Sequence, residues 1–416
     1  MTTAYIVGTG MTPFTRAPDK SVFDLTSEAV HDAMGDAGAS LKDIEFAFFS
    51  NTTQGVMEGQ HLVPGQMALR KLGLGGVPIS NVENACASGS TALHHATMAI
   101  RAGMADVVLA VGVDKMCSDD RTRSFEIFNG AWDVHDVDNT IGRIRAMAEG
   151  FDDQEVTARL DNRKPSPFME VYANWGKFHM NTFGTTQRQL AMVASKNHGH
   201  SVQNPRAQFR DAMSVDDILK ARPIAWPLTL PMCSPISDGA AAVIVCSERA
   251  LARFAKERSV GIRACVLGSG IERDAADMAN HLSRRAALKA YEEAGVDPKD
   301  VSVAEVHDAT AVGEIMQCEF LGLCEFGEGG RMAERGDTML GGRIPVNPSG
   351  GLESKGHPIG ATGLGQIFEL VTQLRGEAGP RQVEGARIAI AENGGGIYGI
   401  EESVTCVTIL EQPGTP

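Results

Sequence analysis

Cys86-Ala87-Ser88-Gly89-Ser90-Thr91 aligns with His357-Pro358-Ile359-Gly360-Ala361-Thr362 in the last quarter of the chain. Each segment stands directly before a predicted helix, over residues 92–102 in the first case and 363–374 in the second, and each helix leads to an apolar strand. The two segments therefore occupy equivalent positions in two copies of one unit. We expect the copies to pack about a pseudo-twofold axis, which brings Cys86 and His357 together near the centre.

The start of the unit is repeated as well. Ile6-Val7-Gly8-Thr9-Gly10 opens the first copy and Val266-Leu267-Gly268-Ser269-Gly270 the second, and a predicted helix follows each. Both helices end in an Ala-Gly pair, with a Lys-Asp pair shortly afterwards. Strands rich in Val, Ile and Ala are typical of sheets that helices cover on both faces. The sequence thus predicts an α/β fold of duplicated βαβαβ units around shared central helices. The alternative is two separate α/β domains without a common site.

Residues 116–227 interrupt this pattern between the two copies. The segment starts polar and charged, passes through an aromatic stretch that contains Met169 and Trp175, and resumes helical spacing at residues 188–197. An insertion of this length is usually a lid or a binding subdomain. Trp175, Phe178 and Met180 are candidates for lining a ligand site, although packing of the lid onto the body is favoured for any one of them. Met169 is a further candidate for substrate binding.

The domain organisation follows from the repeat and its interruption. We predict that residues 1–115 together with residues 228–258 form the N-terminal half of the molecule. Residues 116–227 form a loop or lid domain, and residues 259–416 form the C-terminal half.

The composition of the 416 residues bounds the class of protein. Hydrophobic residues make up 43% and charged residues 22%, which is ordinary for a globular protein with a large core. A net charge of −14 and the lack of a basic run argue against nucleic acid and anionic membranes as partners. We expect neither a signal peptide nor a membrane-spanning segment. The eight cysteines show no CxxC pair and no zinc spacing, which predicts free thiols, no metal and a cytoplasmic enzyme.

Cys86 and His357 are the candidates for nucleophile and base. A cysteine at a helix N-terminus lies where unpaired N–H groups and the helix dipole favour a thiolate. Pro358 suits the first turn of a helix, so His357 stands just before it, where a neutral imidazole can take the thiol proton. The alternatives are a buried structural cysteine and a histidine that only caps the helix.

Two further segments supply candidate oxyanion donors. His307-Asp308 follows a predicted strand, at the edge where α/β sheets place their sites. His307 can donate a hydrogen bond to a developing oxyanion, whereas Asp308 is a candidate for holding the loop. Gly394-Gly395-Gly396 allows the backbone to approach a ligand and to turn N–H groups toward it. Phosphate binding by this glycine turn is the alternative, although neither GxGxxG nor a P-loop lysine accompanies it.

The motifs together resemble the thiolase superfamily over essentially the whole chain. Cys86-Ala87-Ser88-Gly89, Gly356-His357-Pro358 and the glycine turn at residues 394–396 carry the resemblance, as does the segment over residues 234–242. His307-Asp308 is similar to the branch that contains the sterol-carrier-protein thiolases. The resemblance implies a five-layered αβαβα sandwich with a loop domain, a homodimer or homotetramer, and coenzyme A as cosubstrate without a covalently bound cofactor.

The resemblance also assigns roles to individual residues. It implies that Cys86 accepts the acyl group, that His357 deprotonates it, and that His307 and His357 hold the thioester oxygen of the second substrate. The N–H groups of Cys86 and Gly394 correspond to the hole for the acyl-enzyme oxyanion. Substrate and coenzyme A are expected to contact the following residues: Ser234, Met169, Trp175 and Asn393.

Two departures from the family pattern concern the second half-reaction. Ordinary thiolases carry a second, acid/base cysteine where this chain has Glu392, and the sterol-carrier branch carries one where this chain has Ala309. A buried carboxyl group with a raised pKa can shuttle a proton, so Glu392 is the candidate replacement.

The main hypothesis is a thiolase-type acyltransferase that cleaves or forms β-ketoacyl-CoA through an acyl-cysteine. Related proteins of this fold include acyltransferases that need no coenzyme A. They also include side-chain aldolases, which often act with a small zinc-ribbon partner chain. These chemistries and a non-catalytic acyl-CoA- or lipid-binding subunit are the alternatives.

Overall fold

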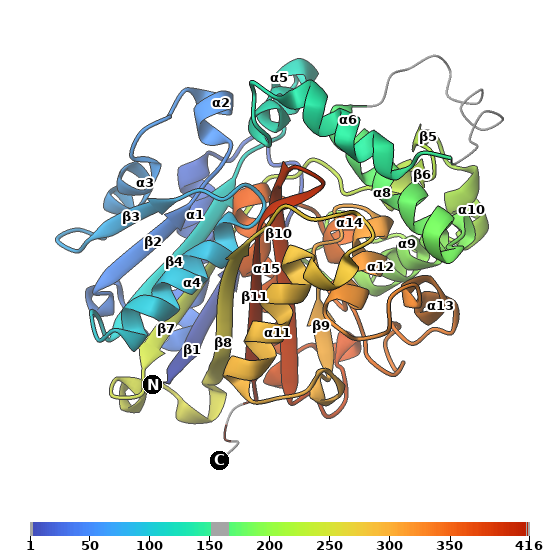
Figure 1. The fold of residues 1–416 in the computed structure, drawn as a ribbon. Coiled ribbons are helices and arrows are strands. Elements are labelled where there is room, and N and C mark those ends of the chain that lie inside the picture. Colours follow the sequence, from blue (N-terminus) through green and yellow to red (C-terminus); the bar gives the residue numbers. More distant parts are fainter. Residues whose placement is uncertain (1–2, 151–165, 413, 415–416) are drawn as a thin grey trace.

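The N-terminal half is built on a five-stranded sheet (Figure 1). A computed structural model describes residues 3–150, 166–412 and 414. The strand order is β3-β2-β4-β7-β1, with β2 parallel to both of its neighbours and β7 antiparallel to β4 and β1. The strands are β1 (Ala4–Met11), β2 (Phe46–Ser50), β3 (Ile79–Val82), β4 (Val107–Asp114) and β7 (Gly239–Ser247).

The C-terminal half repeats this arrangement in the order β9-β10-β11-β8. β9 is parallel to β10, and β11 is antiparallel to β10 and β8, as in the first half. A single parallel bridge between Ala304 and Val346 stands where the first half has β3. The predicted duplication is therefore present in the pairing of the strands. These strands are β8 (Val260–Ser269), β9 (Val303–Glu305), β10 (Ile388–Tyr398) and β11 (Glu401–Glu411).

Helices cover both half-sheets and fill the space between them. α1 (Val22–Ala37) packs on β1 and β7, and α11 (Leu282–Ala294) packs on β8 and β11. α4 (Ser88–Arg101) and α15 (Thr362–Leu374) contact each other and strands of both halves, which produces the predicted αβαβα layering. Antiparallel pairing of β1 with β8 also joins the two half-sheets edge to edge into one nine-stranded sheet, which the sequence did not predict.

The central helices begin where the site is expected. Capping side chains satisfy the first N–H groups of α1, in which Ser21 and Asp24 form a capping box. Neither α4 nor α15 has such a side-chain cap. Apolar residues along both helices, such as Leu93 and Leu364, form one buried cluster with strands of both halves. The two uncapped helix starts are therefore held in place by the core rather than by local caps.

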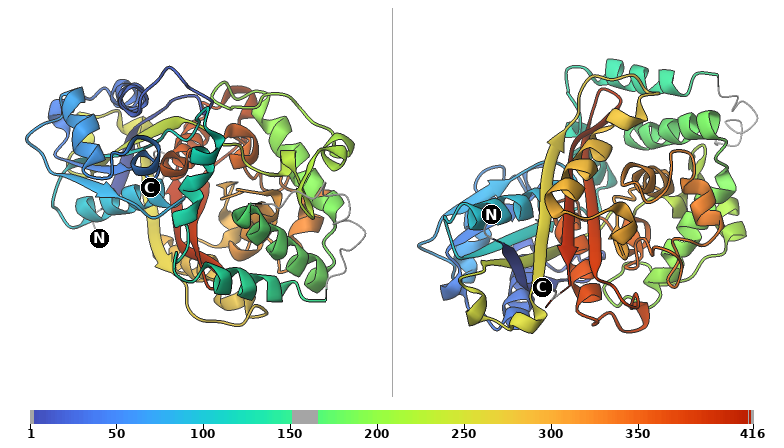
Figure 2. Two further views of the ribbon diagram at one scale, coloured as in Figure 1. Left: turned by 90° about the horizontal axis from the view of Figure 1, so that it is seen from above. Right: turned by 60° about the horizontal axis from the view of Figure 1, so that its bottom comes forward.

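The insertion between the halves is mainly helical and lies beside the C-terminal half (Figure 2). Its buried apolar residues form a cluster with residues of α12 (Ala311–Phe320), for example Trp175 with Val312. Residues 151–165 of this predicted domain lie outside the described part of the chain. The elements of the insertion are α5 (Arg121–Glu126), α6 (Val137–Met147), α8 (Pro167–Phe183), α9 (Gln187–Ser201), α10 (Val215–Lys220), β5 (Pro223–Ala225) and β6 (Leu228–Thr229).

Shorter helices complete both halves. They are α2 (Gln54–Glu58), α3 (Pro64–Leu72), α12 (Ala311–Phe320), α13 (Gly329–Glu334) and α14 (Gly351–Lys355).

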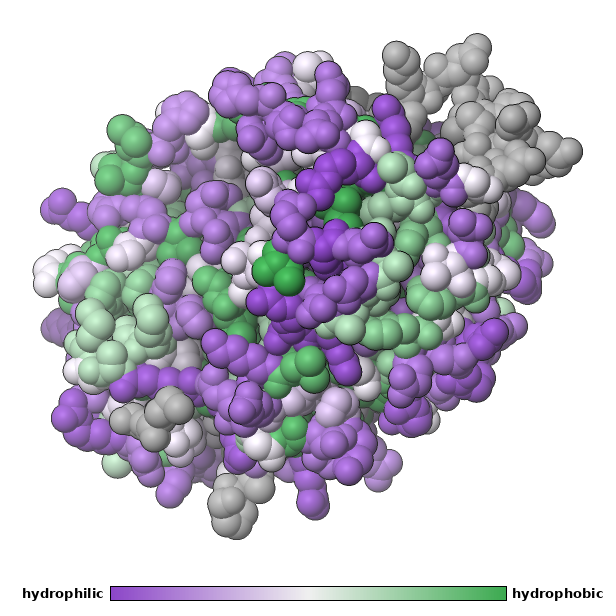
Figure 3. Space-filling model, viewed as in Figure 1, coloured by the Kyte–Doolittle hydropathy of each residue, from purple (hydrophilic) through white to green (hydrophobic). Residues whose placement is uncertain are grey.

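Hydrophilic residues dominate the face in Figure 3, and apolar residues are scattered over it. Within the described residues, no helix combines the length and the apolar character that a bilayer span requires. All eight cysteines are free thiols, as predicted.

Candidate active site

A tight turn between β3 and α4 presents Cys86. Ala85 adopts a left-handed conformation with φ of 47°, which is costly for a residue with a Cβ and must be held by its surroundings. The Ala85 N–H donates to the Glu83 carboxylate at 2.7 Å, and the Ser88 hydroxyl donates to the Ala85 carbonyl at 2.6 Å. The Ser88 oxygen also accepts from the Asn84 N–H at 2.7 Å. These bonds fix the turn at the start of the helix, as the sequence predicted for Cys86.

The side chains of Cys86, His307 and His357 converge at this turn. One ligating atom of each, the sulfur or a ring nitrogen, lies within 4.8 Å of the other two, and all three residues are buried. His307 comes from the loop after β9 and His357 from the loop between α14 and α15, and their ring centroids are 5.3 Å apart. The structure thus brings together the three residues that the sequence singled out. The same atoms are also spaced so that they could hold a metal ion, which the sequence did not indicate.

Hydrogen bonds define which nitrogen of His357 carries the proton. Nδ1 lies 2.6 Å from the Thr362 hydroxyl, and that hydroxyl donates its proton to the Pro358 carbonyl at 2.9 Å. Because a hydroxyl has one proton, the Thr362 oxygen must accept from an Nδ1–H. The Nε2 atom then carries a lone pair, which is the form of histidine that can take a proton from a thiol.

The resting charges of the pair differ from the sequence-based expectation. Burial, Asp114 and Glu83 raise the pKa of the Cys86 thiol to about 12. Burial and the nearby His307 and Lys355 hold the pKa of His357 well below its ordinary value. A helix N-terminus was expected to favour a thiolate, but desolvation and carboxylates outweigh it here. The resting pair is therefore a neutral thiol beside a neutral imidazole, and the proton must move as the sulfur attacks.

His307 offers an unsatisfied ring nitrogen beside this pair. Its Nε2 atom is buried and has no hydrogen-bond partner among the described residues. Burial lowers the pKa of His307 to about 4, so the ring is neutral at pH 7. An unpaired buried polar atom is costly in the free protein, and a substrate oxygen that gains negative charge would satisfy it. This placement fits the predicted oxyanion role of His307.

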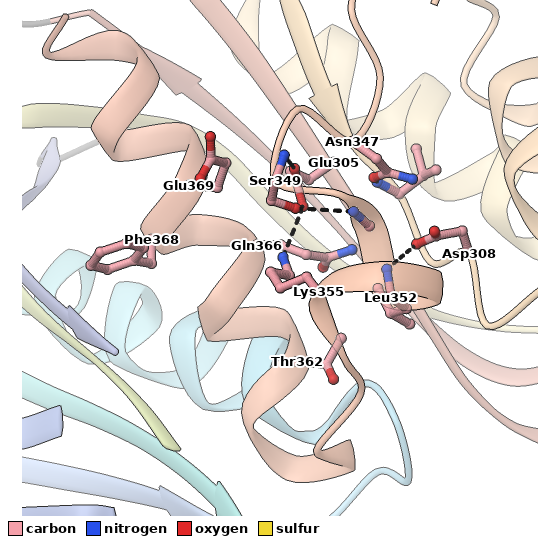
Figure 4. Close-up of polar contacts among 12 residues, drawn as sticks. Glu305, Asp308, Asn347, Ser349, Leu352, Lys355, Thr362, Gln366, Phe368 and Glu369 are labelled. Carbon is pink, nitrogen blue, oxygen red and sulfur yellow. Dashed lines mark hydrogen bonds and ion pairs between the residues drawn. The ribbon is translucent and has the colours of Figure 1, made fainter. Parts of the chain in front are cut away.

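Asp308 and the segment before His357 form a buried polar network behind the site (Figure 4). Asp308 accepts from the Leu352 N–H at 2.7 Å and from the Asn197 amide at 3.1 Å. Lys355 pairs with Glu305 at 3.1 Å, and both side chains are fully buried. Asp308 therefore holds the loop, as the sequence suggested, and the ion pair fixes the chain two residues before His357.

Glu392 lies under His307 rather than in the space above Cys86. Its carboxylate accepts from the Thr405 hydroxyl at 2.8 Å, the Ser283 hydroxyl at 3.4 Å and the His307 N–H at 3.2 Å. Burial and Glu402 raise the pKa of Glu392 to about 8. The raised pKa agrees with the sequence-based prediction, but the side chain does not line the cavity at Cys86. Its contacts make it a support for His307 rather than an acid that touches substrate.

Replacing Glu392 by glutamine is expected to change how stability depends on pH. A carboxyl group whose pKa is raised by folding stabilises the folded protein fully below its unfolded pKa of about 4.3, and loses that contribution as pH rises through 8. We expect the unfolding free energy of the wild type to fall relative to that of Glu392→Gln by about 2 to 4 kcal/mol between pH 5 and pH 9. Urea titrations at several pH values measure this difference. Glu248→Gln, which removes an exposed carboxylate, is the control. A Glu392→Gln curve that runs parallel to that of the wild type would contradict the assignment.

The three glycines at residues 394–396 lie within strand β10 rather than in the expected turn, and this part of the strand passes directly over the Cys86 turn. A Cβ on Gly395 would come within 2.5 Å of the Asn84 carbonyl and 3.0 Å of the Cys86 nitrogen, so glycine is required for this approach. A Cβ on Gly394 would instead point toward the side chain of Glu402. The oxyanion role of the Gly394 N–H stays a prediction. Asn393, expected to contact substrate, instead accepts a hydrogen bond from the Ser90 hydroxyl on α4 and is buried.

A cavity of about 400 Å³ opens beside Cys86 and His357. Ser234 and Met169, two of the expected substrate contacts, line it. Trp175 does not line this cavity: its indole N–H donates to the Ile400 carbonyl at 3.0 Å, and its ring packs in the lid core. Three aromatic residues of the lining were not predicted from the sequence: Phe125, Phe128 and Phe168. The spacing of three between Phe125 and Phe128, on neighbouring helical turns, is a signal that could have indicated a shared face.

A cysteine with a neutral histidine base and a second imidazole, at the junction of two duplicated halves, is an arrangement typical of acyltransferases. The comparisons with known proteins agree with this class. The chain belongs to the thiolase family: the thiolase N-terminal domain matches residues 4–249, and the thiolase C-terminal domain-like family matches residues 271–411.

Several curated relatives cover nearly all of this chain. An acetyl-CoA acetyltransferase of Methanothermobacter thermautotrophicus is 40% identical over 95% of this chain and 96% of its own. Rat sterol carrier protein 2 is 38% identical over 94% of this chain and 69% of its own. The benzoylsuccinyl-CoA thiolase subunit BbsB of Thauera aromatica is 33% identical over 94% of both chains.

Two solved structures share the fold at low sequence identity. The Ltp2-ChsH2(DUF35) aldolase superimposes with a TM-score of 0.77 at 22% identity, over 99% of this chain and 98% of that one. Human mitochondrial 3-ketoacyl-CoA thiolase superimposes with a TM-score of 0.71 at 17% identity, over 99% of both chains. These likenesses confirm the predicted thiolase fold.

Proposed function

We propose that this chain transfers acyl groups between coenzyme A thioesters and cleaves or forms β-ketoacyl-CoA through an acyl-Cys86 intermediate. The convergence of Cys86, His307 and His357 within 4.8 Å carries the proposal. The Nε2 lone pair of His357 and the unpartnered Nε2 of His307 add a base and an oxyanion donor. The acetyl-CoA acetyltransferase relative supports this activity.

One histidine can carry the proton through cleavage without a second cysteine. As the Cys86 sulfur attacks the β-keto carbon, His357 Nε2 takes the thiol proton and the carbonyl becomes an alkoxide. When the alkoxide collapses, the Cα–Cβ bond breaks, leaving an acyl-Cys86 thioester and an acyl-CoA enolate, whose oxygen His307 stabilises. The His357 imidazolium returns its proton to the enolate carbon, which completes the first product.

The second half-reaction uses the same base again. Coenzyme A attacks the acyl-Cys86 carbonyl, and His357 Nε2 takes the proton of its thiol. The tetrahedral intermediate then expels the Cys86 sulfur, which recovers that proton from His357. Every proton in this scheme passes through one nitrogen, so Ala309 and Glu392 need not replace the missing cysteine, and Glu392 supports the loop of His307.

Aldol cleavage is the second candidate function. Thiolases carry their second cysteine at one of two positions, and this chain has Ala309 and Glu392 there. The lack of that cysteine favours aldol cleavage, and so does the fold that the chain shares with an aldolase. That aldolase contains a DUF35 chain, and the Thauera relative is called a subunit, so a small partner chain is part of this proposal. A dimer or tetramer of this chain and a cytoplasmic location also stay proposals.

Product analysis separates the two functions. The purified protein is incubated with a panel of β-ketoacyl-CoA and β-hydroxyacyl-CoA thioesters, with and without coenzyme A, and the products are identified by mass spectrometry. Shortened acyl-CoA formed only in the presence of coenzyme A supports acyl transfer. Release of a ketone or aldehyde without consumption of coenzyme A supports the aldolase. Failure of every acyl-CoA to form an adduct on Cys86 would overturn the acyltransferase proposal.

A further inference from the structure

We propose that the acyl group delivered to Cys86 carries a flat, ring-shaped substituent, and that Phe128 and Phe168 select it. This inference rests on the proposed acyl transfer, because it names the substrate class of the same site. It is carried by the walls of the cavity beside Cys86, which are largely apolar and unusually aromatic.

Aromatic rings form a continuous wall on the lid side of the cavity. The ring of Phe128 lies 6.5 Å from that of Phe125 and 5.6 Å from that of Phe168, measured between centroids. All three residues line the cavity, although aromatic residues make up only 6% of the chain. Tilted rings at these separations are the arrangement that aromatic groups prefer with one another. A ring in the substrate would extend this set.

Further aromatic rings pack against Phe168 from behind. Phe168 packs against Trp132 at 5.8 Å and against Tyr172 at 5.7 Å, and Tyr172 meets Trp175 edge-on at 5.1 Å. Phe168, Tyr172 and Trp175 lie on α8 and are buried. A side chain that is packed on several sides, as Phe168 is, favours one shape of ligand, whereas a flexible side chain adapts to many.

The size of the cavity suits a ring together with a thioester arm. A closed cavity of about 150 Å³ is enough to hold benzene. The cavity here is about 400 Å³ and includes Ser234, which is expected to contact substrate or coenzyme A. The space therefore holds one small ring system and leaves room for the arm that connects it to coenzyme A.

Large apolar side chains are exposed to solvent at the open side of the cavity. Phe125 is 51% exposed, and Leu230, which also lines the cavity, is 48% exposed. Large apolar side chains gain free energy when a ligand removes them from water, at about 25 cal/mol per Å² of apolar surface. A ring-bearing acyl group that enters past Phe125 would cover this surface, and a short straight chain would leave most of it exposed.

The test compares two substrates of equal carbon number. 3-Oxo-3-phenylpropanoyl-CoA and 3-oxononanoyl-CoA both carry nine acyl carbons, and only the first contains a ring. We expect the wild type to favour the phenyl substrate in kcat/KM by at least about tenfold, and Phe128→Leu and Phe168→Leu to lose most of that preference. A wild type that treats both alike, or leucine variants that keep the full preference, would overturn the proposal.

Two controls separate selection of the ring from general damage. Phe183→Leu alters the same lid core away from the cavity, so the ratio between the substrates should stay at the wild-type value. Arg222→Gln removes a charge from the cavity lining and should change both substrates alike. A ratio that shifts equally in Phe183→Leu would show that folding of the lid, not contact with the ring, sets the preference.

A binding measurement distinguishes failure of this inference from failure of the proposed function. Benzoyl-CoA and heptanoyl-CoA each carry seven acyl carbons, and their dissociation constants are measured on the Cys86→Ser variant, in which no cysteine thioester can form at this site. Tighter binding of benzoyl-CoA that Phe168→Leu abolishes supports ring recognition even if no acyl transfer is found. Equal binding of the two thioesters contradicts it whatever the reaction proves to be.

Discussion

Cys86→Ser is expected to abolish acyl transfer and the covalent intermediate while leaving the fold intact. A serine hydroxyl fits the position of the thiol, but His357 would have to deprotonate a much weaker acid, so the variant should form no covalent intermediate. Loss of a nucleophile in a well-studied hydrolase costs on the order of 10⁶-fold in kcat, so we expect a loss of at least about 10⁴-fold here. Intact-protein mass spectrometry after incubation with acyl-CoA should show one added acyl group in the wild type and none in the variant.

Cys324→Ser is the matched control for this experiment. Burial raises the pKa of the Cys324 thiol to about 12, the same value as for Cys86, but Cys324 packs against the outer layer of the C-terminal half. Cys324 is not one of the three clustered residues, which are Cys86, His307 and His357. The control should keep both the adduct and the activity. Acylation that persists in Cys86→Ser and disappears in Cys324→Ser would place the nucleophile elsewhere.

The main features of the fold and the Cys–His pair could be predicted because the chain is a duplication. An internal repeat fixes equivalent positions without any knowledge of side-chain packing, so Cys86 and His357 had to lie at equivalent helix starts. The strands of the two halves pair in the same order, and α4 and α15 lie together between them. The place of His307 in the site could be predicted as well, because His307 follows a strand and lies at the edge of the sheet where the two helix starts meet.

The parts that the sequence did not predict depend on side-chain direction and on burial. Glu392 and Gly395 both lie on β10, and the register of that strand decides which residue faces His307 and which faces Cys86. Helical spacing does not show which aromatic residues of the insertion face the cavity. The sequence therefore pointed to Trp175, which packs in the lid core, and not to Phe128, which lines the cavity. The protonated state of Cys86 arises first from its burial and then from the carboxylates of Asp114 and Glu83.

Lys355→Met is expected to destabilise the protein strongly, because it leaves Glu305 without its partner. Both side chains are fully buried and paired at 3.1 Å (Figure 4), and Glu305 also accepts from the N–H and hydroxyl of Ser349. Removing one partner of a buried ion pair typically costs about 3 to 5 kcal/mol, since the remaining charge is desolvated without compensation. Urea unfolding of the variant at pH 8 should show a loss of this size.

The loss should shrink at low pH, and a second substitution should reverse it. Burial already raises the pKa of Glu305 although Lys355 lowers it, so without the lysine the carboxyl group takes up a proton more readily. A carboxyl group with a raised folded pKa keeps its stability below its unfolded pKa and loses it as pH rises, so Lys355→Met should lose less at pH 5 than at pH 8. In the double variant Glu305→Gln/Lys355→Met no charge is left unpaired, and much of the stability should return. An equal loss at both pH values would mean that Lys355 stabilises the segment before His357 through packing rather than through the ion pair.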